Sequence, residues 1–138
     1  MVKLLHVSVT ARDGDALAGF YRNAFGFRDL RPPQRLSGDI VSRGNGLPGA
    51  EIYSIWLNPP DDDGPFLEIM EYSTTESRAR PAVNATGYGH LAFAVKDLHA
   101  TIAKVTRAGG SMQGEVTDFG SEGEPHLIVY VRDPEGNI

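Results

Sequence analysis

Two stretches of the sequence align without a gap: HVSVTARDGDALAGFYRNAFGF at residues 6–27 and HLAFAVKDLHATIAKVTRAGGS at residues 90–111. The constant offset of 84 residues brings His90 over His6, Asp97 over Asp13 and Gly110 over Gly26. Internal repetition of this kind indicates two copies of one structural unit. Two copies are too few for an open solenoid. We therefore expect a closed, pseudo-symmetric domain with a site between its halves.

Each copy is predicted to open with a strand that leads into a helix. Residues 4–10 and 88–95 have the strand pattern, with apolar side chains opposite the histidine. Asp13 or Asp15 in the first copy, and Asp97 in the second, have the short carboxylate that accepts the free N–H groups of a first helical turn. The first helix carries apolar residues at helical spacing, and these are Leu17, Phe20, Tyr21, Ala24 and Phe25.

The remaining elements complete a βαβββ plan in each copy. Gly26 and Gly109-Gly110 are predicted to end the helices. Residues 34–49 are rich in Gly and polar residues, so a long loop with at most one short strand is expected there. Further strands are predicted at 28–31, 51–57, 66–72, 112–116 and 126–131. The expected fold is α+β, a single domain of two tandem βαβββ modules. We expect module one at 1–75, a linker at 76–86, and module two at 87–138 with its final strand, begun at Ile138, incomplete.

Three side chains on the predicted concave face are candidate metal ligands: His6, His90 and Glu68. The two histidines occupy equivalent positions in the repeat. Glu68 lies in mid-strand on the same face as Phe66 and Met70, where a carboxylate needs a cation or hydrogen-bond donors. Two imidazoles and a carboxylate suit one divalent ion, which would be Ni, Co, Zn, Mn or Fe. A lone histidine is more often structural, and Glu68 alone could be an edge charge; the repeat equivalence favours the metal.

Composition excludes several classes of protein. The net charge is −5 and the basic residues are scattered, so no nucleic-acid surface is expected. No Cys is present, which excludes disulfides and thiolate ligands. No apolar stretch approaches 18 residues, so we expect a cytoplasmic protein without a membrane segment. His99 is expected on a solvated surface, and Asp61-Asp62-Asp63 is predicted to be a turn rather than a calcium loop.

Five stretches together resemble the vicinal oxygen chelate superfamily: LLHVSVTARD, FYRNAFGF, PFLEIMEY, GYGHLAFAVKDL and VYVRDPEGN. The superfamily includes glyoxalase I, methylmalonyl-CoA epimerase, extradiol dioxygenases and the fosfomycin and bleomycin resistance proteins. The resemblance implies that the two modules form a concave sheet around a metal cleft, in which His6, Glu68 and His90 bind one divalent metal ion. The family's remaining Glu follows DPxGN, in the pattern DPxGNxxE. Counted from Asp133, its place lies two residues beyond Ile138, so the fourth ligand is not assigned. The resemblance also implies a homodimer, with His6 and Glu68 of one chain facing His90 of the other.

The resemblance leaves three possible functions. Glu68 favours a glyoxalase-I-like lyase or isomerase, in which this carboxylate moves a proton between adjacent carbons of a small oxygen-bearing substrate and the metal stabilises an enediolate or enolate. A ring-cleaving extradiol dioxygenase with Fe(II) is one alternative. A metal-free protein that sequesters a small molecule or drug is the other, with an aromatic pocket of Tyr53 or Trp56, Phe66, Tyr72 and Tyr130. No glutathione-binding residue is identified. The candidate substrate contacts are Phe66, Met70 and Tyr130.

Overall fold

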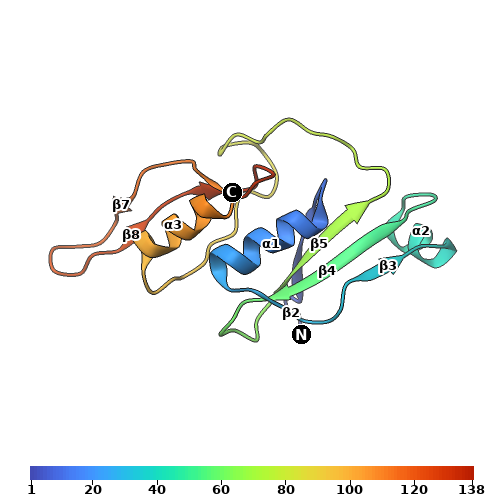
Figure 1. The fold of residues 1–138 in the computed structure, drawn as a ribbon, viewed down its shortest axis with the longest axis horizontal. Helices are drawn as coiled ribbons and strands as arrows, with labels where there is room; N and C mark the ends of the chain where they lie inside the picture. The colour runs from blue at the N-terminus through green and yellow to red at the C-terminus, as the bar shows by residue number, and fades with distance from the viewer.

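The computed structural model describes residues 1–138 as a mixed α+β fold. The first half contains β1 (His6–Thr10), α1 (Gly14–Phe25), β2 (Arg28–Asp29), β3 (Gln34–Leu36), α2 (Asp39–Asn45), β4 (Ile52–Asn58) and β5 (Phe66–Tyr72). The second half contains α3 (Leu98–Arg107), β6 (Ser111–Met112), β7 (Thr117–Asp118), β8 (Leu127–Ile128) and β9 (Val131–Arg132). Figure 1 shows α1 lying across the first-half sheet and α3 beside α1. None of the three helices is long and apolar enough to span a membrane.

The first-half sheet has the order β1-β5-β4-β2, and β3 also pairs with β4. β1 runs parallel to β5, whereas β4 runs antiparallel to it. In this register Glu68 lies opposite Ser8 on one side and Trp56 on the other. Because side chains alternate between the two faces of a strand, the pairing also decides which residues share a face.

The hydrophobic core lies between α1 and one face of this sheet. The buried side of α1 includes Leu17, Phe20 and Tyr21, and the strands contribute Ile55 and Ile69. The predicted apolar stripe of the first helix is therefore confirmed, except that Phe25 is only half-buried. With the helices on this side, the opposite face of the sheet, which carries His6 and Glu68, is not covered by a helix of the first half (Figure 1).

The two copies begin their helices in the same way. The Asp13 carboxylate accepts a hydrogen bond from the backbone N–H of Ala16 at 2.9 Å, and the Asp97 carboxylate accepts one from Ala100 at 2.9 Å. Asp13 rather than Asp15 is therefore the cap. Gly26 ends α1 in the left-handed conformation with φ of 74°, as predicted. The repeat is thus visible in backbone geometry as well as in sequence.

The loop expected at 34–49 contains a helix that the sequence did not reveal. β3 is the one short strand that was allowed for, but α2 follows it. None of the residues of α2 is buried. A helix without a buried side needs no apolar periodicity, and the sequence of this segment has none from which a helix could be predicted. The helix ends at Gly46, whose φ of 75° only glycine adopts freely.

Residues 88–95 do not form the strand that was predicted. In the first half, β1 pairs only with β5, the last strand of its module. Residues 88–95 make a single backbone hydrogen bond of this kind, in which the N–H of Leu91 donates to the carbonyl of Ile138 at 3.1 Å. A strand without a ladder partner has no regular hydrogen bonds, which explains the difference. The strand expected at 126–131 also differs from the prediction, because it is divided into β8 and β9.

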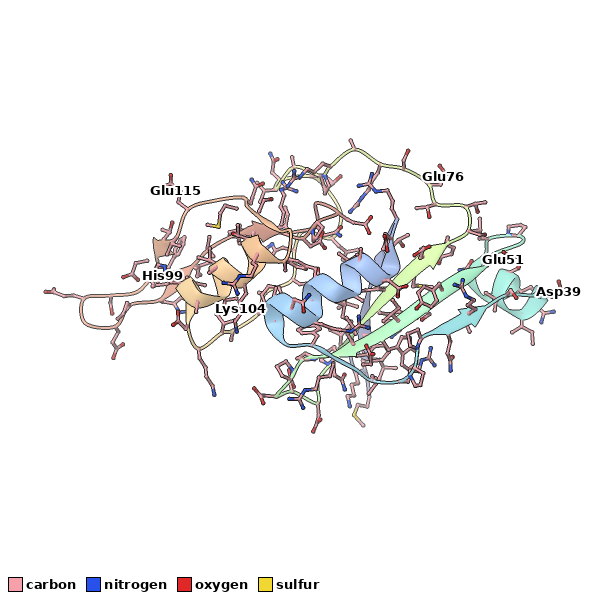
Figure 2. The ribbon with its side chains drawn as sticks, viewed as in Figure 1. Asp39, Glu51, Glu76, His99, Lys104 and Glu115 are labelled. Atoms are coloured by element: carbon pink, nitrogen blue, oxygen red, sulfur yellow. The ribbon has the colours of Figure 1, made fainter.

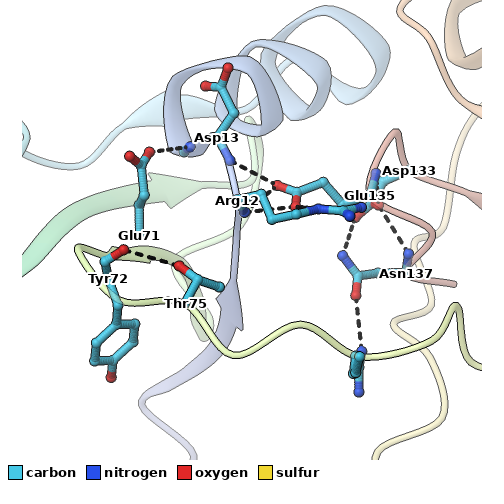
Figure 3. Close-up of polar contacts among 10 residues, drawn as sticks. Arg12, Asp13, Glu71, Tyr72, Thr75, Asp133, Glu135 and Asn137 are labelled. Atoms are coloured by element: carbon cyan, nitrogen blue, oxygen red, sulfur yellow. Dashed lines mark hydrogen bonds and ion pairs between the residues drawn. The ribbon is translucent and has the colours of Figure 1, made fainter.

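A turn in the second half is hydrogen-bonded to the start of α1 (Figure 3). The Glu135 carboxylate accepts hydrogen bonds from the backbone N–H of Arg12 at 2.7 and 3.0 Å. The Asp133 carboxylate accepts one from the buried Tyr21 hydroxyl at 2.9 Å and two more from Asn137. These carboxylates therefore fix the position of the second half against α1.

Replacing Tyr21 with Phe should lower the free energy of unfolding by about 1–2 kcal/mol, because it removes a donor from a buried carboxylate. Tyr53→Phe is the matched control, since its hydroxyl donates to Asp15 at an exposed position. The control should change the free energy by less than about 0.5 kcal/mol. Urea unfolding at pH 7 measures both values. Equal losses would contradict a special contribution from the buried hydrogen bond.

The effect of Tyr21→Phe on the free energy of unfolding should depend on pH. Burial raises the pKa of Tyr21 well above its usual value of 10.0, and the charge of Asp133 and the hydrogen bond to it add to this. The unfolded tyrosine loses its proton first, so this contribution to stability is complete below pH 10 and falls as the pH rises toward the folded-state pKa. The difference in unfolding free energy between wild type and Tyr21→Phe should therefore shrink above pH 10.

Candidate functional site

His6 and Glu68 meet on the open face of the first-half sheet. His6 is the first residue of β1, and Glu68 lies in the middle of β5. The parallel pairing of these strands brings His6 Nε2 to 3.4 Å from Glu68 Oε2. The His6 side chain is 43% exposed, whereas that of Glu68 is 12% exposed. The two predicted ligands of the first half are therefore adjacent, with the imidazole toward solvent and the carboxylate beneath it.

The two oxygens of the Glu68 carboxylate have different surroundings. Oε1 accepts a hydrogen bond from Ser54 Oγ at 2.9 Å and another from Trp56 Nε1 at 3.0 Å. Both donors come from β4, on the same face of the sheet. These bonds offset part of the cost of removing a carboxylate from water. They also fix the rotation of the carboxylate and leave Oε2 directed at His6.

A row of planar groups crosses the sheet beside this pair. The His6 ring stacks on Phe66 with centroids 5.0 Å apart, and Phe66 lies 4.4 Å from the Trp56 ring. The guanidinium carbon of Arg31 lies 3.4 Å from the centroid of Trp56. Phe66 therefore lies between the rings of His6 and Trp56; its role as a substrate contact stays a prediction. Arg31 was missed, because the loop between β2 and β3 gives no periodic signal for where its side chains lie.

The pair has the chemistry of two neighbouring metal ligands. Adjacent ligands on an ion with bonds of about 2.1 Å lie about 3 Å apart, close to the observed separation of Nε2 and Oε2. A ligand carboxylate whose second oxygen is held by hydrogen bonds is typical of metal centres. Within a single chain no third His, Cys, Asp or Glu joins them in a group able to hold an ion. The donors present fit part of a divalent site.

His90, the third predicted ligand, is exposed and lies in the second half. Its ring meets that of Tyr130 edge to face, with centroids 5.0 Å apart. Tyr130, a predicted substrate contact, is therefore a neighbour of His90 rather than of Glu68. Met70 lies opposite Ser54 on β4 and Thr10 on β1, two residues along β5 from Glu68. The single chain thus presents two partial groups, one on each half.

Other residues considered from the sequence lie away from this face. The Tyr53 hydroxyl donates to Asp15 on α1, so Tyr53 is on the helix side of the sheet. That hydrogen bond is the main reason that the pKa of Tyr53 is raised. His99 is exposed on α3, as predicted (Figure 2). Backbone N–H groups of His126 and Gly120 lower the pKa of the Asp118 carboxyl, which they hold in the exposed β7–β8 hairpin.

Comparison with known proteins supports the same fold. Lactoylglutathione lyase of Haemophilus influenzae is 24% identical over 135 residues, which are 98% of this chain and 87% of that protein. A glyoxalase family protein from Bacillus cereus superposes with a TM-score of 0.88 at 22% identity, over 99% of this chain and 90% of that one. Glyoxalase I of Leishmania major superposes with a TM-score of 0.65 at 20% identity, over 99% and 83%.

The sequence profile of one family matches nearly the whole chain, from residue 3 to residue 138. The matched region contains both copies of the repeat and all three candidate ligands. The vicinal oxygen chelate resemblance of the sequence motifs is thereby confirmed: the chain belongs to the Glyoxalase/Bleomycin resistance protein/Dioxygenase superfamily.

Proposed function

We propose that this protein is a divalent-metal-dependent lyase or isomerase of the glyoxalase I type, acting on a small substrate with two neighbouring oxygens. The observation that carries the proposal is the geometry of Glu68. One of its oxygens is held by Ser54 and Trp56, and the other is free to bind or to accept a proton beside His6. The likeness to lactoylglutathione lyase supports the reaction class.

Each residue of the site has a distinct task in this proposal. A divalent ion would supply Lewis-acid polarisation of the substrate oxygens. His6, Glu68 and, from a second copy, His90 would hold it. The Glu68 Oε2 atom would take a proton from one substrate carbon and return it to the next. Ser54 and Trp56 would keep this oxygen in place, and Phe66 would exclude water from its side.

A second copy of the chain would complete the site. The single chain exposes 9590 Å², whereas a folded monomer of its mass exposes about 7,000 Å². Of the 12 residues in the core cluster, only Val105 comes from the second half. The second half, which contains two separate two-stranded sheets, therefore has surface available for a partner. We propose a homodimer in which His90 of one protomer approaches His6 and Glu68 of the other.

Metal content tests the ligand set. Wild-type protein purified without chelator, or incubated with Ni, Co, Zn, Mn and Fe(II) in turn, should bind a divalent ion. His6→Ala and His90→Ala should each lower the metal content sharply, because each removes a ligand. Glu68→Gln should weaken binding by about tenfold or more, since it removes the anionic ligand. Plasma emission spectroscopy gives the content.

His99→Ala is the matched control, because His99 is exposed on α3 and has no place in the site. It should leave the metal content unchanged. Wild-type protein that takes up none of the five ions would overturn the proposed function. It would favour a sequestering role for the aromatic row of His6, Phe66 and Trp56.

A mixing experiment tests whether the site forms between protomers. Neither His90→Ala nor the double variant His6→Ala, Glu68→Gln has a complete ligand set. In a mixed dimer, one site receives His6 and Glu68 from the first variant and His90 from the second. Refolding the two together should restore about one quarter of the wild-type metal content, since about half of the dimers of a two-fold symmetric protein are mixed. No recovery, or a monomer in sedimentation at micromolar concentration, would place the site within one chain.

Activity tests the role of Glu68. The panel of substrates holds a hemithioacetal of methylglyoxal and a thiol, catechols, and acyl-CoA thioesters. We expect wild-type protein to convert the hemithioacetal. Glu68→Gln should lower kcat by at least about 100-fold, because the amide cannot accept the proton. The control Glu71→Gln lies on the helix side of β5 and should keep its activity. Cleavage of catechol with O₂, without any hemithioacetal conversion, would instead support the dioxygenase alternative.

A further inference from the structure

Arg31 ends the row of planar groups on the site face. Its guanidinium carbon lies 3.4 Å from the centroid of the Trp56 ring, which is the distance of direct contact. The indole N–H of Trp56 in turn donates to Glu68. Arg31 is therefore separated from the Glu68 carboxylate by a single side chain. A guanidinium against an aromatic face keeps the N–H groups at its edge available for other partners.

The charge of Arg31 has no ion-pair partner in the structure. Arg22 forms an ion pair with Asp29 at 2.6 Å, and Arg132 donates to Gln113 and to the carbonyl of Gly136. Arg31 takes part in none of the ion pairs, and its buried Nε has no hydrogen-bond acceptor. A buried donor without an acceptor is destabilising and rare in folded proteins. Contact with Trp56 alone does not satisfy these N–H groups.

We infer that Arg31 binds an oxyanionic group of the substrate, a carboxylate or a phosphate, beside the His6–Glu68 pair. The inference rests on the proposed function for the position of the reacting oxygens. The two terminal nitrogens of a guanidinium match both anions, because their parallel N–H groups form two hydrogen bonds to two oxygens. The substrate would then be an acid. Its two neighbouring oxygens would lie at Glu68, and its anionic group would lie at Arg31, on the other side of the Trp56 ring.

Matched chelating probes test this inference on metal-loaded protein. Acetohydroxamate presents two neighbouring oxygens and no acid group, whereas succinomonohydroxamate adds a carboxylate and phosphonoacetohydroxamate a phosphonate. Trp56 is the only tryptophan, so its fluorescence reports binding directly. Wild-type protein should bind at least one acidic probe about tenfold or more tightly than acetohydroxamate. The acidic probe that binds more tightly identifies the anion as a carboxylate or as a phosphate-like group.

Variants at two arginines separate recognition from structure. Arg31→Gln should remove the preference for the acidic probe while leaving acetohydroxamate binding within about twofold of wild type. Arg31→Lys should keep only part of the preference, since it keeps the charge but not the paired N–H groups. Arg35→Gln is the matched control, because Arg35 lies over Tyr53 on the helix side of β4, and it should keep the full preference. Equal weakening of all three probes by Arg31→Gln would overturn the inference.

A metal-free measurement keeps this test independent of the proposed function. Succinate titrated into chelator-treated protein, against chloride at the same ionic strength, should change the Trp56 fluorescence in wild type and not in Arg31→Gln. The same response in both proteins would overturn the role of Arg31. A succinate response that depends on Arg31, together with no hydroxamate binding under any of the five metals, would retain the anion site and overturn the metal-dependent function.

Discussion

The parallel pairing of β1 with β5 is the constraint on which the candidate site depends. It joins the first strand of the module to the last, and so places His6 beside Glu68 although they are far apart in the sequence. The same register places Glu68 opposite Trp56 on β4. A shift of one residue would turn Glu68 into the core beneath α1 and Ile69 onto the open face. The burial of Ile69 and Leu67 therefore holds the His6–Glu68 pair in place as well as the fold.

Burial and hydrogen bonding have opposite effects on Glu68, and their balance gives the site its chemistry. The carboxylate is largely removed from water, which is costly, and the Ser54 and Trp56 donors offset that cost at one oxygen only. The other oxygen keeps its capacity for a cation or a proton. Trp56 links this carboxylate to the guanidinium of Arg31, so one side chain connects the candidate base and the candidate anion site.

The two halves of the chain share local geometry but differ in burial. Asp13 and Asp97 cap their helices alike, yet the core belongs almost wholly to the first half. Asp133 and Glu135 attach the second half to α1 through hydrogen bonds, and Val105 and Phe93 of the second half add apolar contacts with α1 and its neighbours. His90 is exposed in the second half, and we propose that it faces a second protomer. This asymmetry agrees with a site that two protomers build together.

The sequence by itself determined the repeat, the caps at Asp97 and Gly26, and the apolar stripe of α1, because these depend on residues close together in the chain; Asp13 was chosen over Asp15 only by the structure. Alternation along a strand also placed His6 and Glu68 on open faces. The helix α2, the missing ladder at residues 88–95 and the position of Arg31 could not be predicted. An exposed helix has no apolar period, a strand exists only with its partner, and a loop side chain is positioned by what it packs against. Tertiary structure alone decided that Arg31 lies on Trp56 and that Trp56 donates to Glu68.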